Sequence, residues 1–510
     1  MSRMFFLSIL LSLLLPVFGQ VDSVAMRYAA TITESELRTH LTILASDEYE
    51  GRETGMKGEK MAAAYIVDQF RSYGIPPVPH AQEKGMMADG YRQQFPLVLS
   101  KIGGLGLNVD DREWNFLEDY FYFNENVRHG LDAPEVMVIT PVTAGGTRLG
   151  GASKVVMMLD DGHGNTSLFN DLKSLASSLA GTGTEVLLLV NDSARSLMAG
   201  YGPLVNQRRM RLDEPGAKEK PSGLQIVVIT PELAQDILDH AHLSMKKALK
   251  TASRKRVMVK VPIKFTYRSL SERLTGENVL GYVEGSDLKD ELVVVTAHYD
   301  HIGVIDGEVH NGADDDGSGT VAVMAMARAF AKAKAEGHGP RRSLLFMTMS
   351  GEEKGLLGSQ WYTDHPVFPL DGTVADLNID MIGRVDTVYG DSSSYVYVIG
   401  SKRISNELGQ LIEEQNALYT RLDLDYTFDA DSDPNRFYFR SDHYNFAKHG
   451  IPIAFFFNGV HEDYHGPYDE VDKIRFDLLR ERALLVFHSA WEVANRDDRP
   501  KVDRSAPKNE

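Results

Sequence analysis

The sequence of 510 residues contains no cysteine. Disulfide bonds, thiol nucleophiles, zinc fingers and iron–sulfur clusters are therefore excluded, and any metal site must be built from histidine, aspartate and glutamate. Positive charge is also scarce, because 54 lysine and arginine residues stand against 72 aspartate and glutamate residues, for a formal charge of −18. Nucleic acids and anionic membranes both attract a basic surface, so the charge argues against either as a partner.

Long apolar runs are absent except at the start, where residues 4–18 follow Arg3 and the run is broken at Pro16. This pattern predicts a secretory signal peptide, residues 1–19, cleaved after Gly19. The run is shorter than the roughly 20 residues of a transmembrane helix, and an uncleaved anchor is the alternative interpretation. We therefore expect a protein exported to the periplasm or secreted, without stable membrane insertion after cleavage.

Hydrophobic residues make up 43% of the chain and charged residues 25%, which is typical of a folded globular protein. The length favours more than one domain. The pattern of the sequence changes to short apolar runs from about residue 91 and to alternating strands and helices from residue 278, and a polar tail occupies residues 497–510. We therefore expect an inserted domain, residues 111–258, between two parts of a larger domain, residues 20–110 and 259–496.

Residues 33–73 have a helical pattern, interrupted by three glycines. Thr33 with Glu36 three residues later forms a capping box, which predicts a helix start. Short apolar runs between residues 91 and 258 indicate a smaller, β-rich domain. From residue 278 onward, strand-like runs alternate with helix-like segments at 319–336, 404–415 and 476–495. This alternation predicts an α/β fold with a mostly parallel central sheet flanked by helices.

Histidines and carboxylates gather where the predicted strands of this larger domain end. Ligands bind beyond the carboxyl ends of the strands in such sheets. An acidic residue at one strand end usually caps a helix or faces water, but five successive sites fit that interpretation poorly. They form a nitrogen and oxygen ligand set suited to zinc. The residues are His298 and Asp300, Asp314 to Asp316, Glu352 and Glu353, Asp380, and His461 and His465.

The segment from His461 to His465 matches HExxH, the zinc-binding pattern of the zincin proteases. That pattern requires a helix, so that residues four apart share one face. Here it follows an apolar strand and is closed by Gly466 and Pro467, which a helix does not tolerate well. We expect a loop and a chance match.

Glu352 and Glu353 are adjacent at a strand end, where neighbouring side chains point in different directions. One can bind a metal while the other acts as a general base toward metal-bound water, whose pKa falls from 15.7 toward about 7.

Seven motifs in this order resemble the co-catalytic di-zinc aminopeptidase family, which also contains the glutamate carboxypeptidases and, as a divergent branch, the glutaminyl cyclases. The resemblance covers about residues 33–95 and 278–495, and the interval between them resembles the protease-associated domain inserted in some members. The motifs are GRETGMKG, TAHYDHIG, HNGADDDGSGT, SGEEKGLLGS, NIDMIGR, RSDHYNF and DYHGPYDE.

The resemblance implies two zinc ions per chain. His298 and Asp380 would hold one ion, Glu353 and His465 the other, and Asp315 would bridge both. The same resemblance implies that Asp300 orients His298, that Glu352 is the general acid and base acting through a metal-bridging hydroxide, and that Tyr464 stabilises the oxyanion. It also implies a cis peptide bond between Asp315 and Asp316. For Arg440, in the motif RSDHYNF, two interpretations stay open: it reaches the substrate, or it lies on the surface.

The resemblance implies an exported zinc aminopeptidase that removes N-terminal residues from peptides with a free N-terminus. A carboxypeptidase-like specificity on the same fold stays open, because specificity resides in loops outside the motifs. A glutaminyl-cyclase-like acyltransferase normally works with one zinc, whereas all five ligand positions are filled here. A non-enzymatic binding module would show gaps in the ligand set, and none is found.

Overall fold

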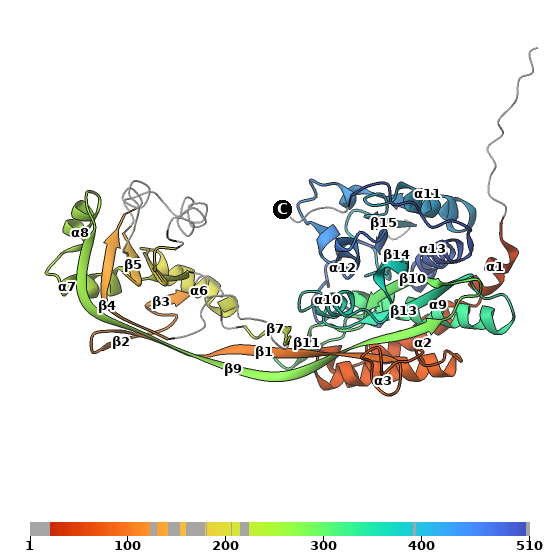
Figure 1. The fold of residues 1–510 in the computed structure, drawn as a ribbon, viewed down its shortest axis with the longest axis horizontal. Helices are drawn as coiled ribbons and strands as arrows, with labels where there is room; N and C mark the ends of the chain where they lie inside the picture. Colours follow the sequence, from red (N-terminus) through yellow and green to blue (C-terminus); the bar gives the residue numbers. More distant parts are fainter. Residues whose placement is uncertain are drawn as a thin grey trace, which may run out of the picture. The chain divides into compact units, whose positions relative to one another are not determined.

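A computed structural model describes residues 21–122, 130–140, 153–159, 179, 181–205, 207–214, 224–390 and 394–505. The predicted signal peptide, residues 1–19, lies outside the described residues. The chain divides into two compact units, Met1–Pro96 with Leu274–Glu510 and Leu97–Arg273 (Figure 1). Among the described residues, no helix is both long and apolar enough to cross a membrane.

Both dividing points fall inside long strands, β1 (Arg92–Val109) and β9 (Val257–Val283). The sequence pattern predicts the divisions near residues 110 and 258 instead. The difference has a physical reason, because a strand that continues past a division keeps its two-residue alternation and leaves no break in the sequence.

The first unit is built on a sheet whose four central strands, β13, β10, β14 and β17, are parallel. Strand β15 is antiparallel to β17 and parallel to the edge strand β16, and residues 279–283 of β9 are antiparallel to β13. This is the mostly parallel α/β sheet that the sequence predicts. In spatial order the strands are β16 (Asp423–Asp425), β15 (Tyr395–Ile399), β17 (Ile453–Phe457), β14 (Thr373–Ile379), β10 (Leu288–His298), β13 (Arg342–Met349) and β9.

Alternate side chains of this sheet enter two different cores, so helices cover both faces (Figure 1). In β10, Val293 and Val295 pack into the core that contains α9 and α13, whereas Leu292 and Val294 pack into the core that contains α10 and α12. Burial on both faces explains why these strands are largely apolar. The helices of the first face are α1 (Ser23–Ala29), α2 (Glu34–Leu44), α3 (Lys57–Ser72), α9 (Gly319–Ala335), α11 (Asn406–Gln415) and α13 (Phe476–Asn495), and those of the second are α10 (Leu357–Asp364) and α12 (His443–Lys448).

The helix start predicted at Thr33 is confirmed, because the backbone N–H of Glu36 donates to Thr33 Oγ1 at 3.3 Å, whereas the carboxylate of Glu36 accepts from Arg328 instead of completing the capping box. Between α2 and α3 the chain makes a short 3-10 turn, η1 (Asp47–Arg52). Gly51 has a φ of +63°, and a Cβ there would lie 2.4 Å from the carbonyl oxygen of His310. Only glycine allows the two backbones to approach this closely.

In the second unit, β4, β5, β6 and β8 are parallel neighbours. Residues 257–265 of β9 are antiparallel to β4, and β3 is antiparallel to β8. Three described helices accompany the sheet. The elements are β2 (Arg112–Trp114), β3 (Tyr120–Tyr122), β4 (Leu131–Ile139), β5 (Val155–Met158), β6 (Val186–Val190), α6 (Ala194–Val205), β7 (Arg209–Leu212), β8 (Gln225–Ile229), α7 (Pro231–Asp239) and α8 (Met245–Ala252).

Candidate metal centre

The predicted ligands meet at one edge of the first unit's sheet. His298 is the last residue of β10, Asp380 directly follows β14, Glu353 follows β13, and His465 lies on the loop after β17. Because these four strands are parallel, their carboxyl ends lie at the same edge. Asp315 joins them from η2 (Ala313–Ser318), the turn that leads into α9.

Asp315 offers one oxygen to each of two histidines. His298 Nε2 lies 3.3 Å from Asp315 Oδ1 and 3.6 Å from Asp380 Oδ1. His465 Nε2 lies 3.2 Å from Asp315 Oδ2 and 3.3 Å from Glu353 Oε2. The five residues thus form two adjacent clusters that share one carboxylate.

The clusters contain polar atoms that the rest of the described chain leaves unpaired. Among the described residues, His298 Nε2, Asp315 Oδ2 and Glu353 Oε1 are buried without a hydrogen-bond partner. Buried polar atoms of this kind are costly unless something else binds them. Imidazole and carboxylate groups facing one another at this spacing fit zinc.

The negative charge of the clusters favours a cation. Burial lowers the pKa of His465, but the contacts with Asp315 and Glu353 and their charges outweigh it and raise the pKa to about 10. A carboxylate pair that stabilises an imidazolium this strongly also attracts a metal ion.

Asp316, next to the shared carboxylate, holds the local backbone. The peptide bond between Asp315 and Asp316 is cis, as the resemblance implies. The carboxylate of Asp316 accepts backbone N–H groups from Gly319 and Met381 at 2.9 Å and from His298 at 3.3 Å. Asp316 lies near His298 and Asp380, but its oxygens already bind the backbone, so it joins β10, α9 and the end of β14.

Asp300 contacts His298 differently from what the sequence predicts. The hydrogen bond to His298 Nδ1 comes from the backbone carbonyl of Asp300 at 3.0 Å, while the carboxylate oxygen is 3.8 Å away. The carboxylate turns instead toward Thr54, whose hydroxyl donates to it at 2.6 Å, and toward the backbone N–H of Glu352 at 3.3 Å. Asp300 therefore connects the strand end that carries His298 to the turn that carries Glu352.

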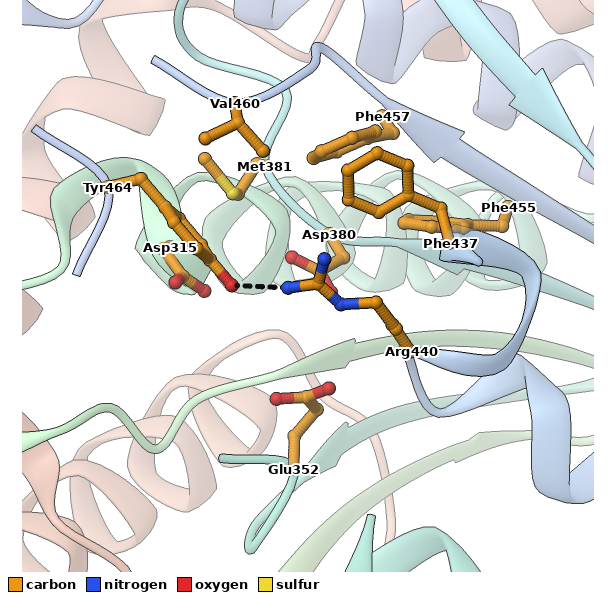
Figure 2. Close-up of a pocket in the computed structure, with 10 residues that line it drawn as sticks. All are labelled: Asp315, Glu352, Asp380, Met381, Phe437, Arg440, Phe455, Phe457, Val460 and Tyr464. Carbon is orange, nitrogen blue, oxygen red and sulfur yellow. Dashed lines mark hydrogen bonds between the residues drawn. The ribbon is translucent and has the colours of Figure 1, made fainter. Parts of the chain in front are cut away.

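Glu352 lies beside the clusters, with Oε2 3.9 Å from His298 Nε2. Burial raises its pKa well above the usual range; the charge of His298 opposes this, and the carboxylates of Asp380 and Glu353 add to it. Glu352 lines a cavity together with Asp315 and Asp380 (Figure 2). A carboxyl group of raised proton affinity at this place is suited to proton transfer.

Tyr464, Arg440 and apolar side chains complete the lining of the cavity (Figure 2). The ring of Tyr464 stacks on His465 with centroids 3.8 Å apart, and Arg440 Nη2 donates to the Tyr464 hydroxyl at 3.2 Å. Arg440 therefore lines the cavity while its side chain stays exposed. The apolar lining consists of Met381, Phe437, Phe455, Phe457 and Val460.

The HExxH match does not form a zincin site. The segment from residue 462 to 465 forms turns rather than a helix, and Glu462 is exposed. His461 Nε2 lies 3.4 Å from Asp314 Oδ2, whereas His465 faces Asp315 and Glu353. The two histidines therefore contact different carboxylates.

Two residues of the motifs, to which the resemblance assigns no role, support the backbone around the centre. Asp469 accepts the backbone N–H groups of Asp314 and Asp315 at 3.0 to 3.1 Å. Arg52 is fully buried and donates to four backbone carbonyls, those of Leu44, Tyr299, Asn311 and Gly312. In the sequence, Arg52 stands out only as a charged residue inside the glycine-rich motif GRETGMKG. The fold shows which carbonyl groups it contacts.

Arg52→Met is expected to lower the free energy of unfolding by about 3 kcal/mol or more, because buried carbonyls lose a charged donor. Urea unfolding followed by circular dichroism measures the change. Arg268→Met, at an exposed position of β9, serves as the control and should stay within about 0.5 kcal/mol. Equal stability of the two variants would contradict the role given to Arg52.

Comparison with known proteins identifies a matching family profile and similar proteins. Residues 278–490 match the sequence profile of peptidase family M28. The chain is 25% identical over 236 residues to aminopeptidase YwaD of Bacillus subtilis strain 168, covering 45% of this chain and 47% of that protein. It is 31% identical over 213 residues to a probable leucine aminopeptidase of Arthroderma benhamiae, covering 40% of this chain and 55% of that protein.

The chain thus spans about half the length of these curated relatives. Its fold is similar to that of the aminopeptidase from Aneurinibacillus sp. strain AM-1, with a TM-score of 0.52 and 18% identity, covering 95% of this chain and 98% of that one.

Proposed function

Residues 278–490 belong to peptidase family M28, and from this membership and the site geometry we propose that the protein is an exported zinc aminopeptidase. One observation carries the proposal: two histidine and carboxylate clusters share Asp315, and Glu352 stands beside them. Export is inferred from the apolar run at residues 4–18. The assignment of the inserted unit as a protease-associated domain is part of the same proposal.

His298, Asp380 and Asp315 would hold one zinc ion, and His465, Glu353 and Asp315 the other. When bound, the ions polarise the scissile carbonyl and lower the pKa of water. Three carboxylates against two divalent cations leave the centre close to neutral.

Glu352 takes a proton from the attacking water and returns it to the leaving amine. Its position in the cavity and its raised pKa suit both steps. Asp300 positions Glu352 by accepting its backbone N–H, and it positions His298 through its own carbonyl. Tyr464, oriented by Arg440, offers a hydroxyl for the developing oxyanion.

The substrate is a peptide with a free N-terminus and an apolar first side chain. The carboxylates around the centre attract an ammonium group, and the apolar lining of the cavity accommodates a side chain. A relative named as a probable leucine aminopeptidase agrees with this preference. Carboxypeptidase-like specificity is the second candidate, because the guanidinium of Arg440 in the cavity is suited to a carboxylate.

A leucyl anilide is expected to be hydrolysed with a kcat/KM about 10–100-fold higher than its N-acetyl derivative. Acetylation removes the charged amine, and a charge-assisted hydrogen bond contributes roughly 1.5–3 kcal/mol. Assaying both substrates at equal enzyme concentration gives the ratio. Comparable rates would contradict the aminopeptidase proposal, and dependence on a free C-terminal carboxylate would favour the second candidate.

Protein purified without chelators is expected to contain two zinc ions per chain, since five ligands with one shared carboxylate form two sites. Elemental analysis measures the content, and dialysis against a chelator should abolish hydrolysis until zinc is returned. One zinc per chain at saturating metal would favour a glutaminyl-cyclase-like enzyme instead.

A further inference from the structure

His301 is a third histidine at the centre, and it has no role in the function proposed above. Its side chain is completely buried. Nδ1 lies 2.9 Å from Glu353 Oε1 and 3.8 Å from Asp315 Oδ2, on the same two carboxylates that His465 faces. The rings of His301 and His465 are edge to face, with centroids 5.9 Å apart.

Hydrogen bonding within the described chain does not account for this ring. Nδ1 of His301 is within hydrogen-bond length of Glu353 Oε1, but among the described residues no contact of either ring nitrogen has hydrogen-bond geometry, and Glu353 Oε1 and Asp315 Oδ2 share this condition. Three unpaired buried atoms from three residues therefore face one another, at the place where a cation would satisfy all of them.

The fold holds the ring in this place from two sides. The backbone N–H of His301 donates to the carbonyl of Arg52 at 3.3 Å. On the other side the ring packs against Gly312, where a Cβ would lie 2.5 Å from the ring carbons. Gly312 has a φ of +53°, so glycine is favoured there both by the backbone conformation and by the contact.

The interatomic distances place His301 in the same class as the proposed ligands. Two atoms bound to one zinc at about 2.0–2.2 Å, with bond angles of roughly 90–110°, lie about 2.8–3.6 Å apart. The four contacts of His298 and His465 with their carboxylates range from 3.2 to 3.6 Å. The separation of 2.9 Å between His301 Nδ1 and Glu353 Oε1 lies in the same interval, and the 3.8 Å between His301 Nδ1 and Asp315 Oδ2 lies 0.2 Å beyond it.

We propose that His301 is a zinc ligand, joining Asp315, Glu353 and His465 at one of the two sites. That site then has four protein ligands, which is typical of closed sites, whereas the site of His298, Asp315 and Asp380 has three and keeps a position open. The open site is the one beside Glu352, whose carboxylate lies 3.9 Å from His298. The closed site holds its zinc more tightly, and the open site serves the substrate. This inference rests on the proposed function.

X-ray absorption spectroscopy of the wild-type holoprotein tests the ligand directly. The expected result is three imidazoles for two zinc ions. Two imidazoles for two zinc ions would overturn the inference and leave the proposed aminopeptidase intact. Wild-type protein that takes up no zinc and does not cleave a leucyl anilide would instead overturn the proposed function.

Variants provide a second measurement that does not depend on activity. His301→Gln keeps a polar group able to contact Glu353 but lacks an imidazole. The zinc affinity of one site, measured by chelator competition, is expected to fall by at least the roughly 10–100-fold that even an outer hydrogen-bond partner contributes. His461→Ala is the matched control, because His461 is also buried with unpaired ring nitrogens among the described residues but faces Asp314. Unchanged zinc affinity in His301→Gln would overturn the proposal.

Discussion

Asp315→Asn is expected to lose both zinc ions and to reduce hydrolysis of a leucyl anilide by at least about 1000-fold. The two oxygens of Asp315 face different histidines, so one substitution weakens both sites. Loss of Lewis acid help costs several kcal/mol in the transition state, and each 1.36 kcal/mol is a factor of ten in rate. Zinc content by elemental analysis and steady-state kinetics on the same preparation measure both effects.

Two further variants make this result specific. His465→Ala removes a ligand that faces only one cluster, so it is expected to release one zinc ion and keep the other. Asp306→Asn is the matched control, since Asp306 is exposed in the turn between β11 (Gly303–Ile305) and β12 (Glu308–His310). If Asp315→Asn retained the zinc content of the wild type, the shared carboxylate would be ruled out.

Glu352→Gln is expected to keep the zinc content of the wild type and to lose roughly 10²–10⁴-fold in turnover, the usual contribution of general acid–base catalysis. Glutamine preserves the size of the side chain but can neither accept nor return the proton. Glu352 is 3.9 Å from His298 Nε2 but is not among the proposed ligands. Zinc analysis together with kcat separates the loss of a proton carrier from the loss of a metal ligand.

Glu462→Gln is the control for this experiment, because Glu462 is the base of the competing HExxH interpretation and is exposed on the loop. We expect it to be close to wild type in both zinc content and rate. A fully active Glu352→Gln beside an inactive, zinc-retaining Glu462→Gln would reverse the assignment of the base.

The sequence by itself determined the chemical nature of the centre and its place in the fold. Without cysteine, the ligands had to be histidine and carboxylate. Apolar runs that alternate with helices identify parallel strands, and the carboxyl ends of parallel strands meet at one edge. Residues that follow different strands, such as His298 and Asp380, could therefore be grouped although 82 positions separate them.

Which atoms face one another was decided only by the tertiary structure. A sequence pattern places a residue at a strand end, but loop conformation and side-chain rotamers set the last few ångströms. His461 and His465 have the spacing of a zinc motif, yet turns direct them to different carboxylates. Asp300 supports His298 through its carbonyl rather than its carboxylate.

His301 gives the same lesson for a residue without an assigned role. It stands in the quoted motif TAHYDHIG, one position after Asp300, and the resemblance attached no function to it. Its ring reaches Glu353 because the carbonyl of Arg52 holds its backbone and Gly312 leaves room beside the ring. Arg52 is far from His301 in the chain, and Gly312 lies in a separate turn. Contacts of this kind leave no periodic pattern in the sequence. The residue types were therefore readable from the sequence, whereas their pairing depended on long-range packing.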